Sequence, residues 1–174
     1  LVFNGEIYNY KSLKSDLVRL GYEFTTDSDT EVLLNLLIEY KEKAIDKLNG
    51  FFAFAFYDSE IDKLLLVRDR FGIKPLYFYE DDNKFIFGSE LRAFFKFDID
   101  KSLNQKAIDL LFTLTYIPAP LSILKNVKKA KPGTYYIYQN NELQETVYYL
   151  PTTNSELELS YDDAKKELKS ELCK

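Results

Sequence analysis

The sequence predicts an α+β fold in which antiparallel strands lie between layers of helices. Two features favour this fold class. Residues 51–87 contain four short apolar runs separated by polar turns, as expected of strands that follow one another in antiparallel order. Residues 51–57 alternate phenylalanine with alanine, so that rings occupy one face and methyl groups the other. A strand of this kind packs between two layers, and flanking helices supply the outer cover.

Composition and charge exclude several classes of function. The 174 residues carry a net charge of −5, and we expect no nucleic-acid partner because phosphate binding needs a basic surface. No apolar run approaches the roughly 20 residues of a membrane span, so we expect no membrane partner either. The chain shows no signal peptide at its start, which predicts a cytoplasmic protein. It contains no histidine, which excludes a Ser-His-Asp or Cys-His unit, and we expect no metal site.

The first fifty residues are predicted to hold two helices. Leucines recur at helical spacing across residues 13–20, and Gly21 suits the end of that helix. The second helix is predicted to open with a capping box, in which Ser28 is the cap and Glu31 lies three residues on. Its apolar residues continue toward Tyr40.

The remaining elements follow from alternation and from turn residues. The sequence predicts a meander of antiparallel strands in its middle and a hairpin near its end. The predicted strands are 1–3, 22–26, 51–57, 63–67, 76–79, 84–87, 134–138 and 143–149, and the further helices are 89–95 and 104–114.

The character of the chain changes after residue 150. Residues 151–155 are typical of a linker, and Ser160 then opens a charged helix. We expect residues 1–150 to be one domain and residues 151–174 to be a linker and the first helix of a second domain. Because the chain begins on an apolar run without methionine, we expect it to be a piece of a longer protein.

Three polar groups lie together near the N-terminus. Asn4 brings an amide, Gly5 an unobstructed backbone and Glu6 a carboxylate, directly after an apolar run. Such a group could hold a developing oxyanion and a substrate ammonium side by side. The same residues also suit a tight turn after an edge strand, because Asn-Gly is a common turn dipeptide.

Seven motifs follow one another along the chain: NGEIYN (4–9), SDTEV (28–32), LNGFFAFA (48–55), RDRFGIKPLY (68–77), GSEL (88–91), YIPAP (116–120) and KPG (131–133). In this order they resemble the glutamine-hydrolysing asparagine synthetases, a branch of the class II glutamine amidotransferases. The resemblance implies the four-layer αββα sandwich of N-terminal-nucleophile hydrolases, with two antiparallel sheets and without its first strands here.

The resemblance implies a glutamine site. Asn4 and Gly5 match the oxyanion hole of the family, and Glu6 and Asp29 match the residues that hold the α-ammonium of glutamine. Asp29 could instead complement the dipole of the helix that it opens, but we favour contact with the ligand. In the family an amino-terminal cysteine attacks the glutamine amide, with its own α-amino group as the base. The released ammonia passes to a synthetase domain that activates aspartate with ATP and magnesium.

The chain departs from the family in three respects. It lacks the amino-terminal cysteine, the arginine-bearing segment that grips the glutamine carboxylate, and the pyrophosphate loop of the synthetase domain. Cys173 lies in the terminal charged helix and is not the nucleophile. We therefore predict that this polypeptide alone has no glutaminase activity and binds no cofactor, since ATP and magnesium belong to the absent synthetase domain. Missing strands would leave sheet edges uncovered, which predicts a possible homo-oligomer.

Some alternatives stay open at this point. The parent protein could transfer ammonia to another carboxylate acceptor, or the fold could serve as a non-catalytic binding module. Arg68, Asp69, Arg70 and Lys74 could face the synthetase domain or could fix their own loop through a network of ion pairs. We favour the loop interpretation. We also interpret Glu90 as a charge at a helix start.

Overall fold

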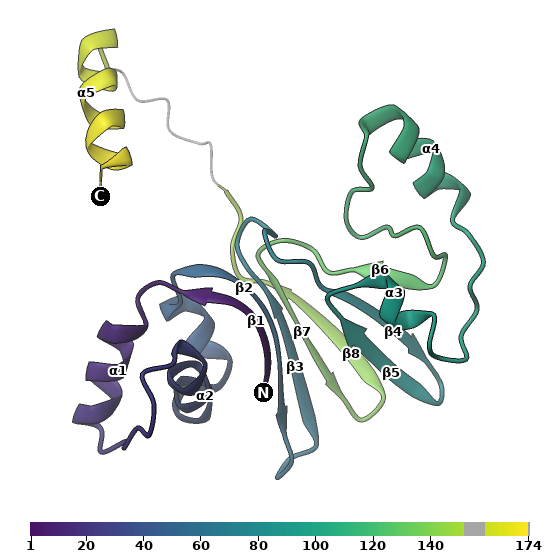
Figure 1. Ribbon diagram of the computed structural model, residues 1–174, viewed down its shortest axis with the longest axis horizontal. Coiled ribbons are helices and arrows are strands. Elements are labelled where there is room, and N and C mark those ends of the chain that lie inside the picture. Colours follow the sequence, from purple (N-terminus) through teal and green to yellow (C-terminus); the bar gives the residue numbers. More distant parts are fainter. Residues whose placement is uncertain (152–158, 174) are drawn as a thin grey trace.

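The computed structural model describes residues 1–151 and 159–173. Two antiparallel sheets stack against each other, and two helices cover the outer face of the larger sheet (Figure 1). The strands are β1 (Val2–Ile7), β2 (Gly50–Asp58), β3 (Lys63–Arg68), β4 (Tyr77–Asp81), β5 (Lys84–Gly88), β6 (Val127–Lys129), β7 (Thr134–Gln139) and β8 (Glu142–Val147). The helices are α1 (Tyr10–Arg19), α2 (Asp29–Tyr40), the 3-10 helix η1 (Lys41–Lys47), α3 (Leu91–Phe94), α4 (Gln105–Leu114) and α5 (Tyr161–Leu172).

The larger sheet has the order β1-β2-β3-β7-β8. The alternation predicted for β2 is confirmed. Phe52 and Phe54 belong to the cluster that α1 and α2 cover, whereas Ala53 and Ala55 belong to a second cluster on the opposite face. The methyl groups leave room there for the second sheet, so β2 lies between a helical layer and another sheet.

The smaller sheet has the order β5-β4-β6. Phe78 on β4 packs against Tyr136 of the larger sheet, with ring centroids 5.0 Å apart. The outer face of this sheet is covered by Phe94 of α3 together with Ile99 and Leu124. The layers are therefore helix, sheet, sheet and a thin helical layer, and the αββα arrangement predicted from the resemblance is confirmed.

The single meander predicted for residues 51–87 is wrong. β2 and β3 form a hairpin in the larger sheet, but β4 and β5 form a hairpin in the smaller one, and the second neighbour of β3 is β7. The two hairpins have similar alternation, so the local pattern carried no information on which sheet each joins. The sequence also missed β6 and η1, which are short.

The segment before α2 differs from its prediction. No strand forms at residues 22–26, because the Glu31 carboxylate accepts hydrogen bonds from the backbone N–H groups of Thr25 (2.9 Å) and Thr26 (2.7 Å). Ser28 does cap α2, by accepting from the N–H of Thr30 at 3.1 Å. The prediction that Glu31 completes a capping box is wrong, because its carboxylate accepts from Thr25 and Thr26 and not from the N–H of Ser28.

The C-terminal region is described in part. Residues 152–155 of the predicted linker lie outside the described residues. The charged helix is confirmed as α5, with Ser160 as its cap, and its residues are exposed. Among the helices of residues 1–151 and 159–173, none is long and apolar enough to cross a bilayer.

Candidate functional site

The free edge of β1 is the centre of the candidate site. Phe52, the cross-strand partner of Gly5, directs both of its backbone groups toward β3, where they meet Asp69. Backbone groups of an antiparallel strand alternate between its two sides, so the N–H of Gly5 points away from β2 and off the edge. Ile7, two residues on, follows the same alternation, and its N–H donates to the Asp29 carboxylate at 3.0 Å.

Gly5 cannot be replaced without strain. Its φ is +153°, and a Cβ at this position would lie 2.2 Å from the carbonyl oxygen of Phe51 and 2.7 Å from the Cα of Phe52. Both obstacles are backbone atoms of the neighbouring strand, which cannot move aside cheaply. The glycine therefore keeps β1 and β2 in register while its N–H stays open to the edge.

Asp29 reaches β1 because α2 is packed tightly. The helix buries Val32, Leu33, Leu36 and Leu37 in the cluster that covers β2. Asp29 is the first residue of this helix, so the packing carries its carboxylate to the end of β1. The structure thereby brings together two motifs that are 22 residues apart in the sequence.

Asn4 and Glu6 lie on the face of β1 that is opposite to Gly5 and Ile7. The Asn4 amide nitrogen donates to the Ser89 hydroxyl at 3.1 Å. Glu6 is exposed, and within the part of the chain that the structure describes its carboxylate makes no hydrogen bond or ion pair. A carboxylate without a partner is available to an incoming cation.

The turn interpretation of Asn4-Gly5 is wrong. Both residues lie inside β1, and the turn comes later, at residues 8–9. The structure thus places Asn4, Gly5 and Glu6 in β1 and the Asp29 carboxylate at the end of that strand. Their roles toward a ligand stay predictions.

The charged segment 68–74 fixes its own loop. The Arg68 guanidinium donates to the carbonyls of Gly72, Lys74 and Ala130, and burial lowers its pKa. Asp69 is 1% exposed. It accepts hydrogen bonds from the N–H groups of Phe52, Phe71, Ile73 and Lys74. The prediction that these charged residues fix their own loop is therefore supported, although their partners are backbone groups and not a network of ion pairs.

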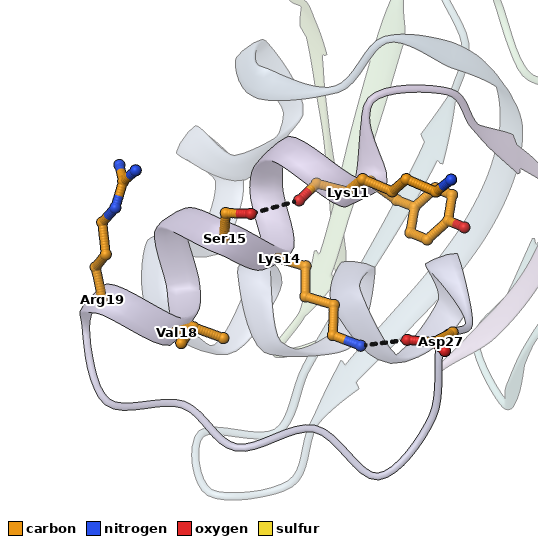
Figure 2. Close-up of a pocket in the computed structure, with 7 residues that line it drawn as sticks. Lys11, Lys14, Ser15, Val18, Arg19 and Asp27 are labelled. Carbon is orange, nitrogen blue, oxygen red and sulfur yellow. Dashed lines mark hydrogen bonds and ion pairs between the residues drawn. The ribbon is translucent and has the colours of Figure 1, made fainter.

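A pocket lies away from these residues, on the solvent side of α1 (Figure 2). Its volume is about 680 Å³, and its lining includes none of the four predicted site residues. The ammonium of Lys14 is already bound there to Asp27 at 2.7 Å and to the carbonyl of Thr26 at 2.9 Å. We therefore keep the edge of β1 as the candidate site.

Comparisons with known proteins identify relatives of the chain. The chain is 40% identical over 136 residues to asparagine synthetase [glutamine-hydrolyzing] 1 of Bacillus subtilis. This alignment covers 78% of the chain and 22% of the relative. The chain is also 38% identical over 152 residues to putative asparagine synthetase [glutamine-hydrolyzing] 2 of Methanocaldococcus jannaschii. This second alignment covers 86% of the chain and 29% of the relative. The chain thus spans less than a third of the length of these relatives.

A solved structure shows the same fold. It is the glutamine phosphoribosylpyrophosphate amidotransferase of B. subtilis, with a TM-score of 0.60, 21% identity, and coverage of 86% of this chain and 29% of that one. Residues 1–149 match the family described as glutamine amidotransferase domain. With its two stacked antiparallel sheets and its seven motifs in order, the chain belongs to the glutamine amidotransferase domain family.

Proposed function

We propose that this chain binds L-glutamine at the free edge of β1, as part of the glutaminase of an asparagine synthetase. The observation that carries the proposal is the pair of neighbouring outward N–H groups on this edge. In the part of the chain that the structure describes, the N–H of Gly5 is open, whereas that of Ile7 holds the Asp29 carboxylate. Two residues span about 7 Å along a strand, which is comparable to the extended length of glutamine between its side-chain amide and its α-amino group.

Each predicted residue has a role in this pose. The Asn4 amide and the Gly5 N–H donate to the amide oxygen of glutamine, which becomes an oxyanion when the amide is attacked. Loss of one such donor raises the barrier by about 3 kcal/mol in related chemistry. Glu6 and Asp29 receive the α-ammonium, and two carboxylates around one cation favour ligands that carry an amino group.

The chain does not supply the nucleophile. Its single cysteine, Cys173, is exposed at the end of α5, and the family's reaction uses an amino-terminal cysteine. We infer that the 174-residue polypeptide by itself hydrolyses no glutamine. Release of glutamate from glutamine by the purified polypeptide would overturn this inference.

The partner of this domain is proposed to be a synthetase domain of the same parent protein. There ATP and magnesium would serve the amidation of aspartate with the released ammonia, in the cytoplasm. The names of the relatives support this assignment. The loop that Arg68 and Asp69 fix also supports this assignment, because its Phe71 and Ile73 are about two-thirds exposed. A rigid apolar surface of this kind suits contact with another domain.

Calorimetric titration of the polypeptide with L-glutamine tests the proposal, and Asp29→Asn is the decisive variant. We expect it to reduce glutamine affinity by about tenfold or more, since it removes a charged partner of the ammonium. Asp27→Asn is the matched control, because Asp27 lies two residues away and pairs with Lys14. Equal affinities of the wild type and Asp29→Asn, or no binding by the wild type, would contradict the proposed site.

A further inference from the structure

Ser89 connects the two sheets at the candidate site. It follows β5 in the smaller sheet, whereas Asn4 lies in β1 of the larger sheet, 85 positions earlier. The Asn4 amide nitrogen donates to the Ser89 hydroxyl at 3.1 Å. Both residues line a cavity of about 90 Å³ between the sheets. This hydrogen bond therefore lies where Asn4 would meet the glutamine amide.

We propose that Ser89 is a positioning residue that holds the plane of the Asn4 amide toward the ligand; the proposal rests on the glutamine site proposed above. A carboxamide has two N–H donors and one acceptor oxygen, and its last torsion is broad and nearly two-fold. Either end of the group could thus face a ligand. In the rotated state the Asn4 oxygen would face the substrate oxygen and repel it.

A hydroxyl can bond to either end of a carboxamide, so the substrate oxygen, which only accepts, selects the nitrogen end. The hydroxyl of Ser89 fixes the plane of the amide for this contact. It accepts one N–H of Asn4 and leaves the second N–H for the substrate oxygen. Among the described residues, no other group is hydrogen-bonded to the Asn4 side chain. Orientation of a catalytic donor by a supporting hydrogen bond is a common requirement of preorganised sites. Ser89 acts on the substrate through Asn4 and does not touch it.

The neighbouring glutamate does not share this role. Glu90 is exposed, and its carboxylate forms an ion pair with Arg92. Glu90 is also the residue before α3, but its side chain makes no capping hydrogen bond. The GSEL motif drew attention to Glu90 in the sequence, whereas the structure assigns the link to the site to Ser89.

Three variants of the polypeptide test the proposal by NMR and by glutamine titration. In Ser89→Ala we expect the Asn4 side-chain amide resonances to move toward those of a free carboxamide. We expect glutamine affinity to fall about fivefold, as for the loss of one neutral hydrogen bond. Ser89→Thr keeps the hydroxyl and should preserve both readouts. Glu90→Gln is the matched control and should change neither. Unchanged Asn4 resonances in Ser89→Ala would overturn the proposal.

A double-mutant cycle separates positioning from a general structural effect. If Ser89 acts through Asn4, then Ser89→Ala should cause no further loss of affinity in an Asn4→Ala background. An equal loss in both backgrounds would overturn the proposal. Should Ser89→Ala not fold, Ser89→Cys offers a weak acceptor of similar size for the same comparison. If the wild type binds no glutamine, the proposed function fails, and the Asn4 resonances still decide whether Ser89 orients the amide.

Discussion

Helices α2 and α4 have similar local sequences but different surroundings. Both have a capping side chain: Ser28 accepts from the N–H of Thr30, and Asn104 accepts from the N–H of Ala107. Yet α2 buries four large apolar residues, whereas Ala107 is the one buried residue of α4. Phe112 of α4 is 84% exposed. Figure 1 shows α2 against the larger sheet and α4 projecting beside the smaller one.

The difference shows which helix can hold a site. A capped amphipathic sequence is enough to predict a helix, but burial of its apolar face is what fixes the helix in space. The carboxylate of Asp29 can be positioned to within a hydrogen bond of β1 because the helix behind it is anchored by its core residues. No comparable anchor holds the side chains of α4.

The largest expected effect comes from a matched pair of leucine truncations. Leu37 of α2 is fully buried, and Leu111 of α4 is 37% exposed. We expect Leu37→Ala to lower the free energy of unfolding by about 2–5 kcal/mol, because it opens a cavity in the core. Leu111→Ala should cost less than about 1 kcal/mol. Urea unfolding of both variants checks this, and equal losses would mean that α4 is anchored as firmly as α2.

Removal of the two caps should have a smaller effect. We expect Ser28→Ala to lower the free energy of unfolding by about 1 kcal/mol and to weaken glutamine binding, since Asp29 follows the cap directly. Asn104→Ala should instead unfold α4 locally, with loss of amide protection there and little change in global stability. Hydrogen exchange together with glutamine titration distinguishes the two. A change in glutamine affinity in Asn104→Ala would argue against this separation.

The smallest effect is a pH dependence confined to the start of α2. The backbone N–H of Thr25, followed by the Thr26 hydroxyl, lowers the pKa of Glu31 to about 2 from an ordinary value of 4.5. Because the folded pKa lies below the unfolded one, the stability contributed by Glu31 is fully present above about pH 4.5. It is lost as the pH falls toward 2. The first turn of α4 contains no acidic residue.

Thermal unfolding of the wild type and Glu31→Gln across this pH range checks the dependence. The variant should be less stable at neutral pH, and the difference should shrink below about pH 4.5 and vanish near pH 2. A difference that stays constant from pH 7 to pH 2 would show that the Glu31 hydrogen bonds do not contribute through its charge.

Much of the architecture could be predicted from local patterns. The alternation of β2, the helix ends at Gly21 and Ser28, and the late hairpin follow from spacing and from turn residues that act over a few positions. The failures have a different origin. The segment 22–26 has an apolar pattern like that of a strand, but a side chain from α2 takes the hydrogen bonds that a neighbouring strand would need.

The candidate site shows the same division. The sequence by itself determined that an amide, a glycine and two carboxylates are present in motifs of this family, because residue identities and short spacings are written in the chain. Only the tertiary structure decided that Asp29 meets the edge of β1 and that Ser89 holds Asn4. Such contacts join residues far apart in sequence, and the packing of sheets and helices around a common core sets them.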